Sequence, residues 1–176
     1  MTPNLTLFIS TVSKFSLSIF VLMMLTGCAD IKTGANEFPE PFGYVTDLED
    51  LFSEAEEIEL ELFIEEYEFQ SANEIAIITI KEIQPYNNMM IYATDIANHW
   101  GVGKNDKDNG LLIAISDSLG RTAIATGEGT EEAISDEYCE IIIDSIMIPK
   151  FKEKEYYEGV RRALLLLTRE WDDSDK

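Results

Sequence analysis

A polar loop, Gly101-Val102-Gly103-Lys104-Asn105-Asp106-Lys107-Asp108-Asn109-Gly110, leads directly into an apolar segment, Leu111-Leu112-Ile113-Ala114-Ile115-Ser116. A helical pattern ends at the first glycine of the loop, and the apolar segment predicts a buried strand. Asp106 and Asp108 place carboxylate oxygens at the start of this strand, and oxygen is the donor atom that Ca²⁺ or Mg²⁺ requires. The loop is therefore interpreted either as part of a cation site or as a solvated polar turn.

The segments before this loop predict a parallel βαβ unit. Residues 75–80 form a β-branched apolar run typical of a strand buried on both faces, and residues 88–100 predict a helix. A crossover of this length joins two parallel strands with a right-handed connection. Ligands of open α/β sheets gather outside the carboxyl ends of the strands. The aspartate loop enters its strand at the amino end, so a site there must rest on its own ligands.

The remaining segments complete one domain. Helices are expected over residues 48–70, 137–148 and 155–171, and an antiparallel strand over residues 121–126. Thr46 or Asp47 is expected to cap the first of these helices, and Ser135 or Asp136 the second, which Pro149 is expected to end. The fold class predicted is a single α/β domain with a small mixed β-sheet of about four strands, covered by helices on both faces.

The first and last of these helices have distinct faces. The core stripe expected in the first comprises Leu51, Ala55, Ile58 and Leu62, widened by Phe52 and Phe63. The stripe expected in the last comprises Tyr156, Val160, Ala163, Leu164 and Leu167. The other face of the first helix is acidic, with no lysine or arginine between Asp47 and Glu68. It is either a solvated surface or a docking surface for a basic protein partner.

The overall charge excludes one class of partner. The chain has 34 Asp and Glu residues against 13 Lys and Arg residues, a formal net charge of −21. Such a surface repels nucleic acid and anionic lipid headgroups, and it attracts cations or basic proteins. We therefore expect no binding of nucleic acid.

The N-terminal residues predict a lipoprotein. Lys14 is the only charge in residues 1–27, and residues 15–25 form an apolar run that suits a signal peptide and is short for a membrane span. This run ends in Leu25-Thr26-Gly27-Cys28, which resembles a bacterial lipobox. We expect cleavage before Cys28, its lipidation, a flexible tether over residues 28–41 and a lipid-anchored, extracytoplasmic location at a bacterial membrane. The alternative is a secretory signal without lipid.

Two other residues invite functional interpretations that the sequence does not favour. Cys139 lies in an apolar helical stretch without a histidine nearby, which is typical of a buried, inert thiol. His99 is the only histidine, so a zinc site or a Ser-His-Asp triad would depend on that one residue.

Five ordered motifs resemble those of the TPM domain family, named after thylakoid lumen proteins, phosphatases and modulators. The motifs are Gly43-Tyr44-Val45-Thr46-Asp47, Trp100-Gly101-Val102-Gly103, Asp108-Asn109-Gly110-Leu111-Leu112-Ile113, Thr126-Gly127-Glu128-Gly129-Thr130-Glu131, and Ile148-Pro149-Lys150-Phe151 with Tyr156-Tyr157-Glu158-Gly159-Val160. They place the domain at about residues 42–168, followed by a polar tail over residues 169–176. The resemblance implies a helix-flanked α/β fold, a membrane-tethered extracytoplasmic protein and a divalent cation near the acidic loop.

Two functions are compatible with the resemblance, because the family includes both acid phosphatases and accessory subunits of membrane complexes. The function favoured is a non-catalytic, cation-binding accessory module at a membrane. The alternative is a metal-assisted phosphomonoesterase, in which Asp106 or Asp108 would ligate the metal and Arg121 would contact the phosphate. In either case Asp47 and Glu128 are further candidate ligands of Ca²⁺ or Mg²⁺, because two loop carboxylates supply too few oxygens.

Overall fold

The computed structural model describes residues 38–104 and 106–174. The predicted signal peptide, the predicted lipidation site Cys28 and most of the predicted tether lie outside the described residues.

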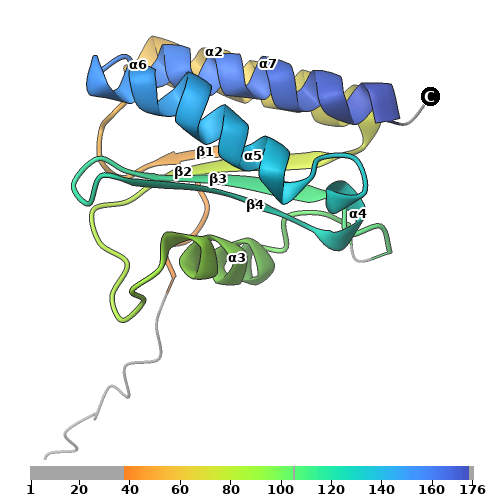
Figure 1. Cartoon of the computed structure of the whole chain (residues 1–176), viewed down its shortest axis with the longest axis horizontal. Coiled ribbons are helices and arrows are strands. Elements are labelled where there is room, and N and C mark those ends of the chain that lie inside the picture. The colour runs from red at the N-terminus through yellow and green to blue at the C-terminus, as the bar shows by residue number, and fades with distance from the viewer. Residues whose placement is uncertain (1–37, 105, 175–176) are drawn as a thin grey trace, which may run out of the picture. The chain divides into compact units, whose positions relative to one another are not determined.

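The sheet has the predicted mixed arrangement. Its four strands are β1 (Val45–Asp47), β2 (Glu74–Thr79), β3 (Gly110–Ser116) and β4 (Arg121–Thr126), which lie side by side in the order β1-β2-β3-β4 (Figure 1). The first three strands are parallel, and β4 returns antiparallel to β3. The carboxyl ends of β1, β2 and β3 therefore share one edge of the sheet, and the amino end of β3 lies at the other.

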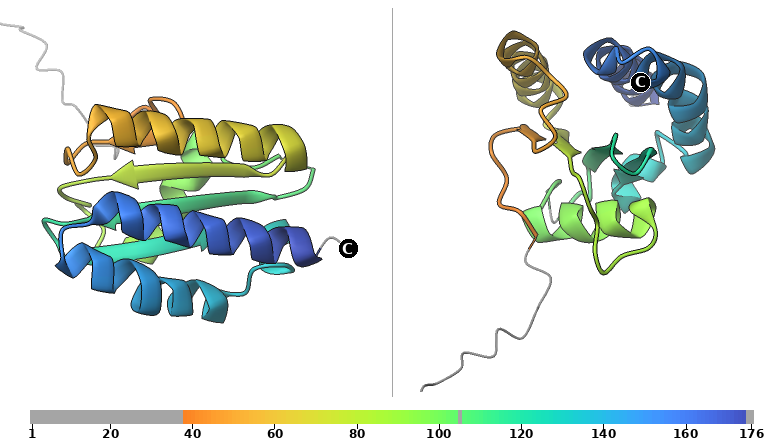
Figure 2. Two further views of the ribbon diagram at one scale, coloured as in Figure 1. Left: turned by 90° about the horizontal axis from the view of Figure 1, so that it is seen from above. Right: turned by 90° about the vertical axis from the view of Figure 1, so that its left-hand side faces the viewer.

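Helices cover both faces of the sheet, as predicted. They are α2 (Glu54–Ser71), α3 (Met89–Trp100), α4 (Glu128–Glu131), α5 (Asp136–Ile142), the π-helical segment η1 (Ile143–Met147), α6 (Ile148–Lys152) and α7 (Tyr156–Ser174). One face is covered by α3, and the opposite face by α2, α7 and the α5–α6 segment (Figures 1 and 2). Within residues 38–104 and 106–174, no helix has the length and apolar composition needed to cross a membrane.

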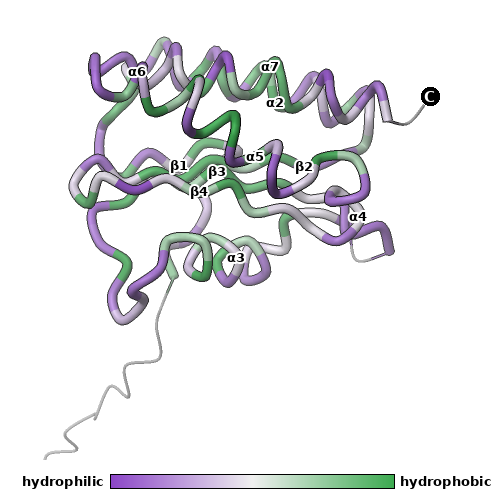
Figure 3. Tube along the Cα trace, viewed as in Figure 1, coloured by the Kyte–Doolittle hydropathy of each residue, from purple (hydrophilic) through white to green (hydrophobic). Residues whose placement is uncertain are grey.

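Two hydrophobic cores follow from the alternation of side chains along the strands. On β2, Ile75 and Ile77 face α2 and α7, whereas Ala76 and Ile78 face α3. Every residue of β3 is buried, which explains its continuous apolar composition. In Figure 3 the strands in the middle of the sheet accordingly have the green colour of hydrophobic residues. The stripe predicted for the last helix is confirmed: Tyr156, Val160, Ala163, Leu164 and Leu167 are all buried.

The face that α2 buries differs from the predicted one. The helix begins at Glu54, with Ser53 as its N-cap, and it buries Leu60, Ile64 and Tyr67. Three residues of the expected core stripe are exposed: Ala55, Ile58 at 53% and Leu62 at 58%. The prediction was wrong because α2 carries apolar residues on two sides at the same helical spacing.

Hydrogen bonds to the start of the domain fix the rotation of α2. The N–H of Val45, in the edge strand β1, donates to Oε1 of Glu61 at 2.7 Å. The hydroxyl of Tyr44 donates to Oε2 of Glu68 at 2.6 Å. These two glutamates therefore face β1, and the side of α2 that carries Ile58 and Leu62 is turned toward solvent.

Two predicted boundaries also change. Pro149 does not end its helix: it lies in the first turn of α6, which follows the π-helical segment η1 without a break. Ser135 caps α5 as expected. Residues 38–41, which the sequence assigns to the tether, lie against α3: the ring of Phe38 is 5.6 Å from that of Tyr92, and the indole N–H of Trp100 donates to the carbonyl oxygen of Pro39 at 2.7 Å.

Candidate functional site

Asn109 organises the amino edge of the sheet, immediately before β3. Its buried side-chain amide donates to the carbonyl oxygen of Ala72 and to Oδ1 of Asn73, both at 2.9 Å. Its Oδ1 accepts the N–H of Lys104 at 3.0 Å. Ala72 ends α2 and Lys104 follows α3, so one side chain joins the ends of two crossovers.

The main chain of the aspartate loop lies directly against the turn after β4. A Cβ on Gly127 would lie 2.1 Å from the carbonyl oxygen of Asp108, and one on Gly129 would lie 1.9 Å from that of Lys107. Only glycine permits this approach. The N–H of Gly129 donates to the carbonyl oxygen of Asp108 at 3.2 Å, which fixes the loop from this side.

Three of the four predicted cation ligands lie at this edge. Asp106, Asp108 and Glu128 are exposed, and their carboxylates make no hydrogen bond or ion pair with any described residue. Among the described residues, no group of three or more His, Cys, Asp or Glu side chains is arranged to hold a metal ion. In this arrangement the loop does not assemble the oxygen ligands that Ca²⁺ or Mg²⁺ requires.

The fourth predicted ligand, Asp47, lies at the opposite edge, at the carboxyl end of β1. Its carboxylate accepts the N–H of Phe52 at 2.8 Å and the hydroxyl of Thr79, which ends β2. Thr79 in turn accepts the N–H of Glu49 at 2.9 Å. Asp47 therefore shapes the connection between β1 and α2 and does not join the other three residues.

The carboxyl edge holds a cleft of about 390 Å³, between the β3–β4 turn and the connection from α6 to α7. The residues that line it are Ile115, Ser116, Asp117, Gly120, Arg121, Thr122, Ile148, Phe151, Lys152, Lys154 and Tyr156. In open α/β sheets this edge is where ligands bind.

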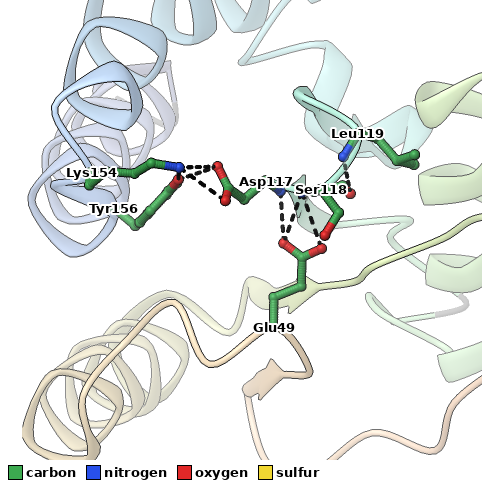
Figure 4. A network of polar contacts seen from close by, with 7 residues as sticks. Glu49, Asp117, Ser118, Leu119, Lys154 and Tyr156 are labelled. Carbon is green, nitrogen blue, oxygen red and sulfur yellow. Dashed lines mark hydrogen bonds and ion pairs between the residues drawn. The ribbon is translucent and has the colours of Figure 1, made fainter.

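A polar network fixes the wall of the cleft (Figure 4). Asp117 accepts hydrogen bonds from the ammonium of Lys154 at 2.8 Å and from the hydroxyl of Tyr156. On the other side of the turn, the carboxylate of Glu49 accepts the N–H groups of Asp117 at 2.8 Å and of Ser118 at 3.4 Å. The bond from Lys154, followed by that from Tyr156, holds the pKa of Asp117 below its ordinary value, so this carboxylate is ionised at neutral pH.

Lys154 has a backbone conformation that usually requires glycine, with φ at 62°. Its N–H donates to the carbonyl oxygen of Phe151, in α6, at 3.0 Å, and the N–H of Glu155 donates to that of Lys150 at 3.0 Å. These two bonds close the end of α6 as in a Schellman motif. The lysine side chain reaches Asp117 from this position.

Two more cations border the cleft. Arg121 donates from one guanidinium nitrogen to the carbonyl oxygen of Asn87 at 2.8 Å, and Lys152 makes no hydrogen bond or ion pair with the described residues. Arg121 begins β4 at the carboxyl edge, roughly 20 Å along the strands from Asp106 and Asp108 at the amino edge. The predicted phosphate contact and the predicted metal ligands are thus not brought together.

The outer face of α2 is a second notable surface. Ile58, Leu62 and Phe69 are exposed on it, Phe69 at 90%. The separations between them are close to whole helical turns, so they form one stripe. We call this stripe, with the glutamates beside it, the α2 outer face.

The glutamates of α2 have no cationic partner in the described part of the chain. The helix carries eight of them, and none takes part in an ion pair there. Burial, followed by the nearby charges of Asp47, Asp50, Glu54 and Glu61, raises the pKa of Glu57 above its ordinary value. The charge on this helix is therefore electrostatically unfavourable in the isolated domain.

Neither the thiol nor the imidazole contributes to these surfaces. Cys139 is buried in the core, as expected, and burial raises its pKa to about 12, which keeps the thiol neutral. The ring of His99 lies 5.3 Å from that of Phe38, on the α3 side of the domain.

Comparison with protein families settles the relationship suggested by the motifs. The model of the TPM domain matches residues 45–170. The chain belongs to the TPM domain family. A comparison with curated proteins gave no significant match.

Solved structures similar to this TPM domain come from bacteria. The N-terminal domain of a protein from P. gingivalis has a TM-score of 0.67 and 30% sequence identity, and the match covers 74% of this chain and 83% of that one. A protein of the psychrophilic bacterium Bizionia argentinensis has a TM-score of 0.59 and 16% identity, covering 72% and 86%. The N-terminal domain of a Corynebacterium glutamicum protein has a TM-score of 0.55 and 14% identity, covering 78% and 84%. The last two matches show the fold alone.

The motifs of this TPM domain lie mainly where main-chain segments meet. Asn109, Gly127 and Gly129 hold the amino edge together, and Thr130 donates from its hydroxyl to the carbonyl oxygen of Gly110 at 2.9 Å. The residues that line the cleft are largely outside these motifs. Sequence reasoning missed the site at Asp117 because its partners Lys154 and Tyr156 are 37 and 39 residues away.

Proposed function

We propose that this TPM domain is a non-catalytic accessory module, which binds a basic, amphipathic segment of a partner protein through the α2 outer face. Acylated Cys28 would hold it outside the cytoplasm at a bacterial membrane. The observation that carries the proposal is the exposed stripe of Ile58, Leu62 and Phe69 among glutamates that lack cationic partners in the described residues.

The apolar stripe supports a docking role. Single exposed apolar residues are common on soluble proteins, but here three lie along one face of the same helix. Recognition between a helix and a groove uses apolar anchors at this spacing. A partner segment that covers Ile58, Leu62 and Phe69 would remove them from water.

The charge supports a basic partner. Lysines and arginines beside the apolar residues of the partner would pair with the glutamates of α2 and relieve the repulsion around Glu57. A second copy of this chain is a poor occupant, because it would bring eight more glutamates to the same surface. An anionic membrane surface is repelled for the same reason.

A synthetic peptide tests the α2 outer face. The probe is an 18-residue helix of leucine and lysine with all its leucines on one face, and binding is measured by fluorescence anisotropy on the mature chain. We expect binding that weakens with salt and falls by about tenfold or more in Ile58→Ser/Leu62→Ser/Phe69→Ser. The matched control is Ile91→Ser, which changes an exposed residue of α3 on the other side of the sheet and should bind as the wild type does.

Two results would contradict the proposal. Equal binding by the triple variant would show that the stripe takes no part. If a peptide of the same composition, with its leucines scattered around the helix, bound as tightly as the amphipathic peptide, the binding would be due to net charge alone.

An acid phosphatase remains the second candidate function, because Arg121, Lys152 and Lys154 line the same cleft at the carboxyl edge as the ionised carboxylate of Asp117. Turnover of p-nitrophenyl phosphate at acidic pH, with and without Mg²⁺, tests it. A phosphatase that uses the cleft should lose activity in Arg121→Gln and keep it in the triple variant of α2.

A further inference from the structure

The cleft at the carboxyl edge combines an apolar floor with a cationic rim. Ile115 and Tyr156 are buried beneath it, and Ile148 and Phe151 are half-buried at its wall. We propose that this cleft binds the carboxylate group of a small organic anion whose apolar body lies on that floor. The proposal is independent of the α2 outer face, which lies on a different element.

The rim retains cationic donors for such a ligand. Lys154 is engaged by Asp117, which neutralises both charges locally. Lys152 has no partner among the described residues, and Arg121 uses one nitrogen toward Asn87, so its other N–H groups remain for a ligand. These two residues leave the rim positive in a protein with a net charge of −21, and a guanidinium fits the geometry of a carboxylate.

The walls of the cleft are already in position. The β3–β4 turn is held on one side by Glu49, which accepts the N–H groups of Asp117 and Ser118, and on the other by Lys154 and Tyr156 (Figure 4). The N–H of Gly120 donates to the carbonyl oxygen of Asp117 at 3.1 Å and closes the turn. A ligand would not have to order this segment, which lowers the cost of binding.

The size and lining of the cleft favour a compact carboxylate. Its volume of about 390 Å³ is at the small end of the range for ligand pockets. The apolar floor matches a short hydrocarbon or an aromatic ring and would desolvate a phosphate dianion at a cost. The same chemistry occurs in free organic acids and at the C-terminus of a polypeptide with an apolar last residue.

The first experiment titrates the ¹⁵N-labelled mature chain with 4-phenylbutyrate and follows the amide signals of the β3–β4 turn. We expect a dissociation constant on the order of 1 mM or tighter, given the size of the ligand. The double variant Arg121→Gln/Lys152→Gln should weaken binding by about tenfold or more. Lys81→Gln removes an exposed cation elsewhere and should bind like the wild type, as should the triple variant of α2.

Matched ligands decide which chemistry the cleft recognises. The neutral 4-phenylbutanol should bind at least about tenfold more weakly than 4-phenylbutyrate if the cations recognise the carboxylate. Equal binding of the alcohol, no displacement of the turn signals, or tighter binding of inorganic phosphate would each overturn the proposal.

A peptide ending in Ile-Phe with a free carboxylate, compared with its C-terminal amide, distinguishes the two sources. Stronger binding of the free peptide than of 4-phenylbutyrate assigns the cleft to polypeptide C-termini. The reverse order assigns it to free organic acids.

Discussion

The ammonium of Lys154 lies 2.8 Å from Oδ1 of Asp117, although the lysine has a φ of 62°. A glycine at this position would close α6 with less strain, but it would lack the side chain that reaches the β3–β4 turn. The sequence thus accepts an unfavourable backbone conformation where it gains a contact between distant segments. Residues of this kind are enriched at functional sites, in keeping with the cleft beside it.

Two substitutions of Lys154 distinguish the effect of its backbone conformation on stability from the effect of its side chain. Lys154→Gly and Lys154→Ala both remove the contact with Asp117, but only glycine relieves the positive φ. We expect the glycine variant to melt a few degrees above the alanine variant. Thermal unfolding followed by circular dichroism measures the difference, and equal melting of the two variants would contradict the assigned backbone conformation.

Asn109→Ala should be strongly destabilising. It removes three hydrogen bonds at the amino edge and leaves the buried Oδ1 of Asn73 and the half-buried carbonyl oxygen of Ala72 without this partner. We expect a loss of about 2–3 kcal/mol in the free energy of unfolding, measured with urea. The neighbouring Asp106→Ala, at an exposed position, is the control and should change the free energy by less than about 0.5 kcal/mol.

The raised pKa of Glu57 predicts that removing its charge stabilises the fold, and that this stabilisation depends on pH. A carboxyl group whose pKa is higher in the folded state destabilises the fold where it is ionised, and this effect fades as pH falls through the folded pKa. Glu57→Gln should therefore raise the melting temperature at pH 7 and raise it less at pH 5, which is above the isoelectric point of about 4.2. Glu82→Gln controls for the change in net charge. If it raised the melting temperature at pH 7 as much as Glu57→Gln does, the surroundings of Glu57 would not be the cause.

Calcium binding by the aspartate loop remains a prediction. The unpaired carboxylates of Asp106, Asp108 and Glu128 at one edge favour weak binding, with rearrangement of the loop to complete the ligand set. A hundredfold excess over the dissociation constant would stabilise the domain by about 2.7 kcal/mol, a rise of several degrees in melting temperature. Asp108→Asn should abolish the rise; a chain that melts identically in calcium and in chelator has no such site.

Lipidation of Cys28 is tested by fractionation. A single acyl chain binds membranes only marginally, whereas several chains anchor a protein stably. A mature protein whose N-terminal cysteine carries several acyl chains should therefore be found in the membrane fraction. Cys28→Ser should be released from the membrane fraction into the soluble fraction. A full-length Cys28→Ser chain that stays in the membrane fraction would show that residues 1–27 act as an uncleaved anchor.

The secondary structure was predictable because the strands and α7 have unambiguous patterns. The apolar run of β3 is short and bounded by turn residues, which indicates a buried strand, and the stripe of α7 has helical spacing over many residues. In α2, Ile58 and Leu62 have the same spacing as Leu60 and Ile64, so periodicity alone cannot decide which pair is buried. The hydrogen bonds from Val45 to Glu61 and from Tyr44 to Glu68 decide which pair is buried. The two bonded residues are 16 positions apart in the first case and 24 in the second.

The candidate sites were less predictable for a related reason. The aspartate loop was predicted to bind a cation because its oxygen-bearing residues lie close together in the sequence. In the structure, Asn109 and the glycines join main-chain segments at this edge. The cleft depends on residues from the β3–β4 turn, α6 and the start of α7, none of which is unusual in its local sequence. Only the folded chain places Arg121, Lys152 and Lys154 around one apolar floor.

The hydrogen bond from Val45 to Glu61 bears on the solubility of the protein during and after folding. Strand β1 is at the border of the sheet, where free N–H groups can recruit a strand from another molecule and start aggregation. Here one such N–H is already occupied by a carboxylate, and the strand spans only three residues. The β1 edge of this apolar sheet is thus protected against pairing with a strand from another molecule.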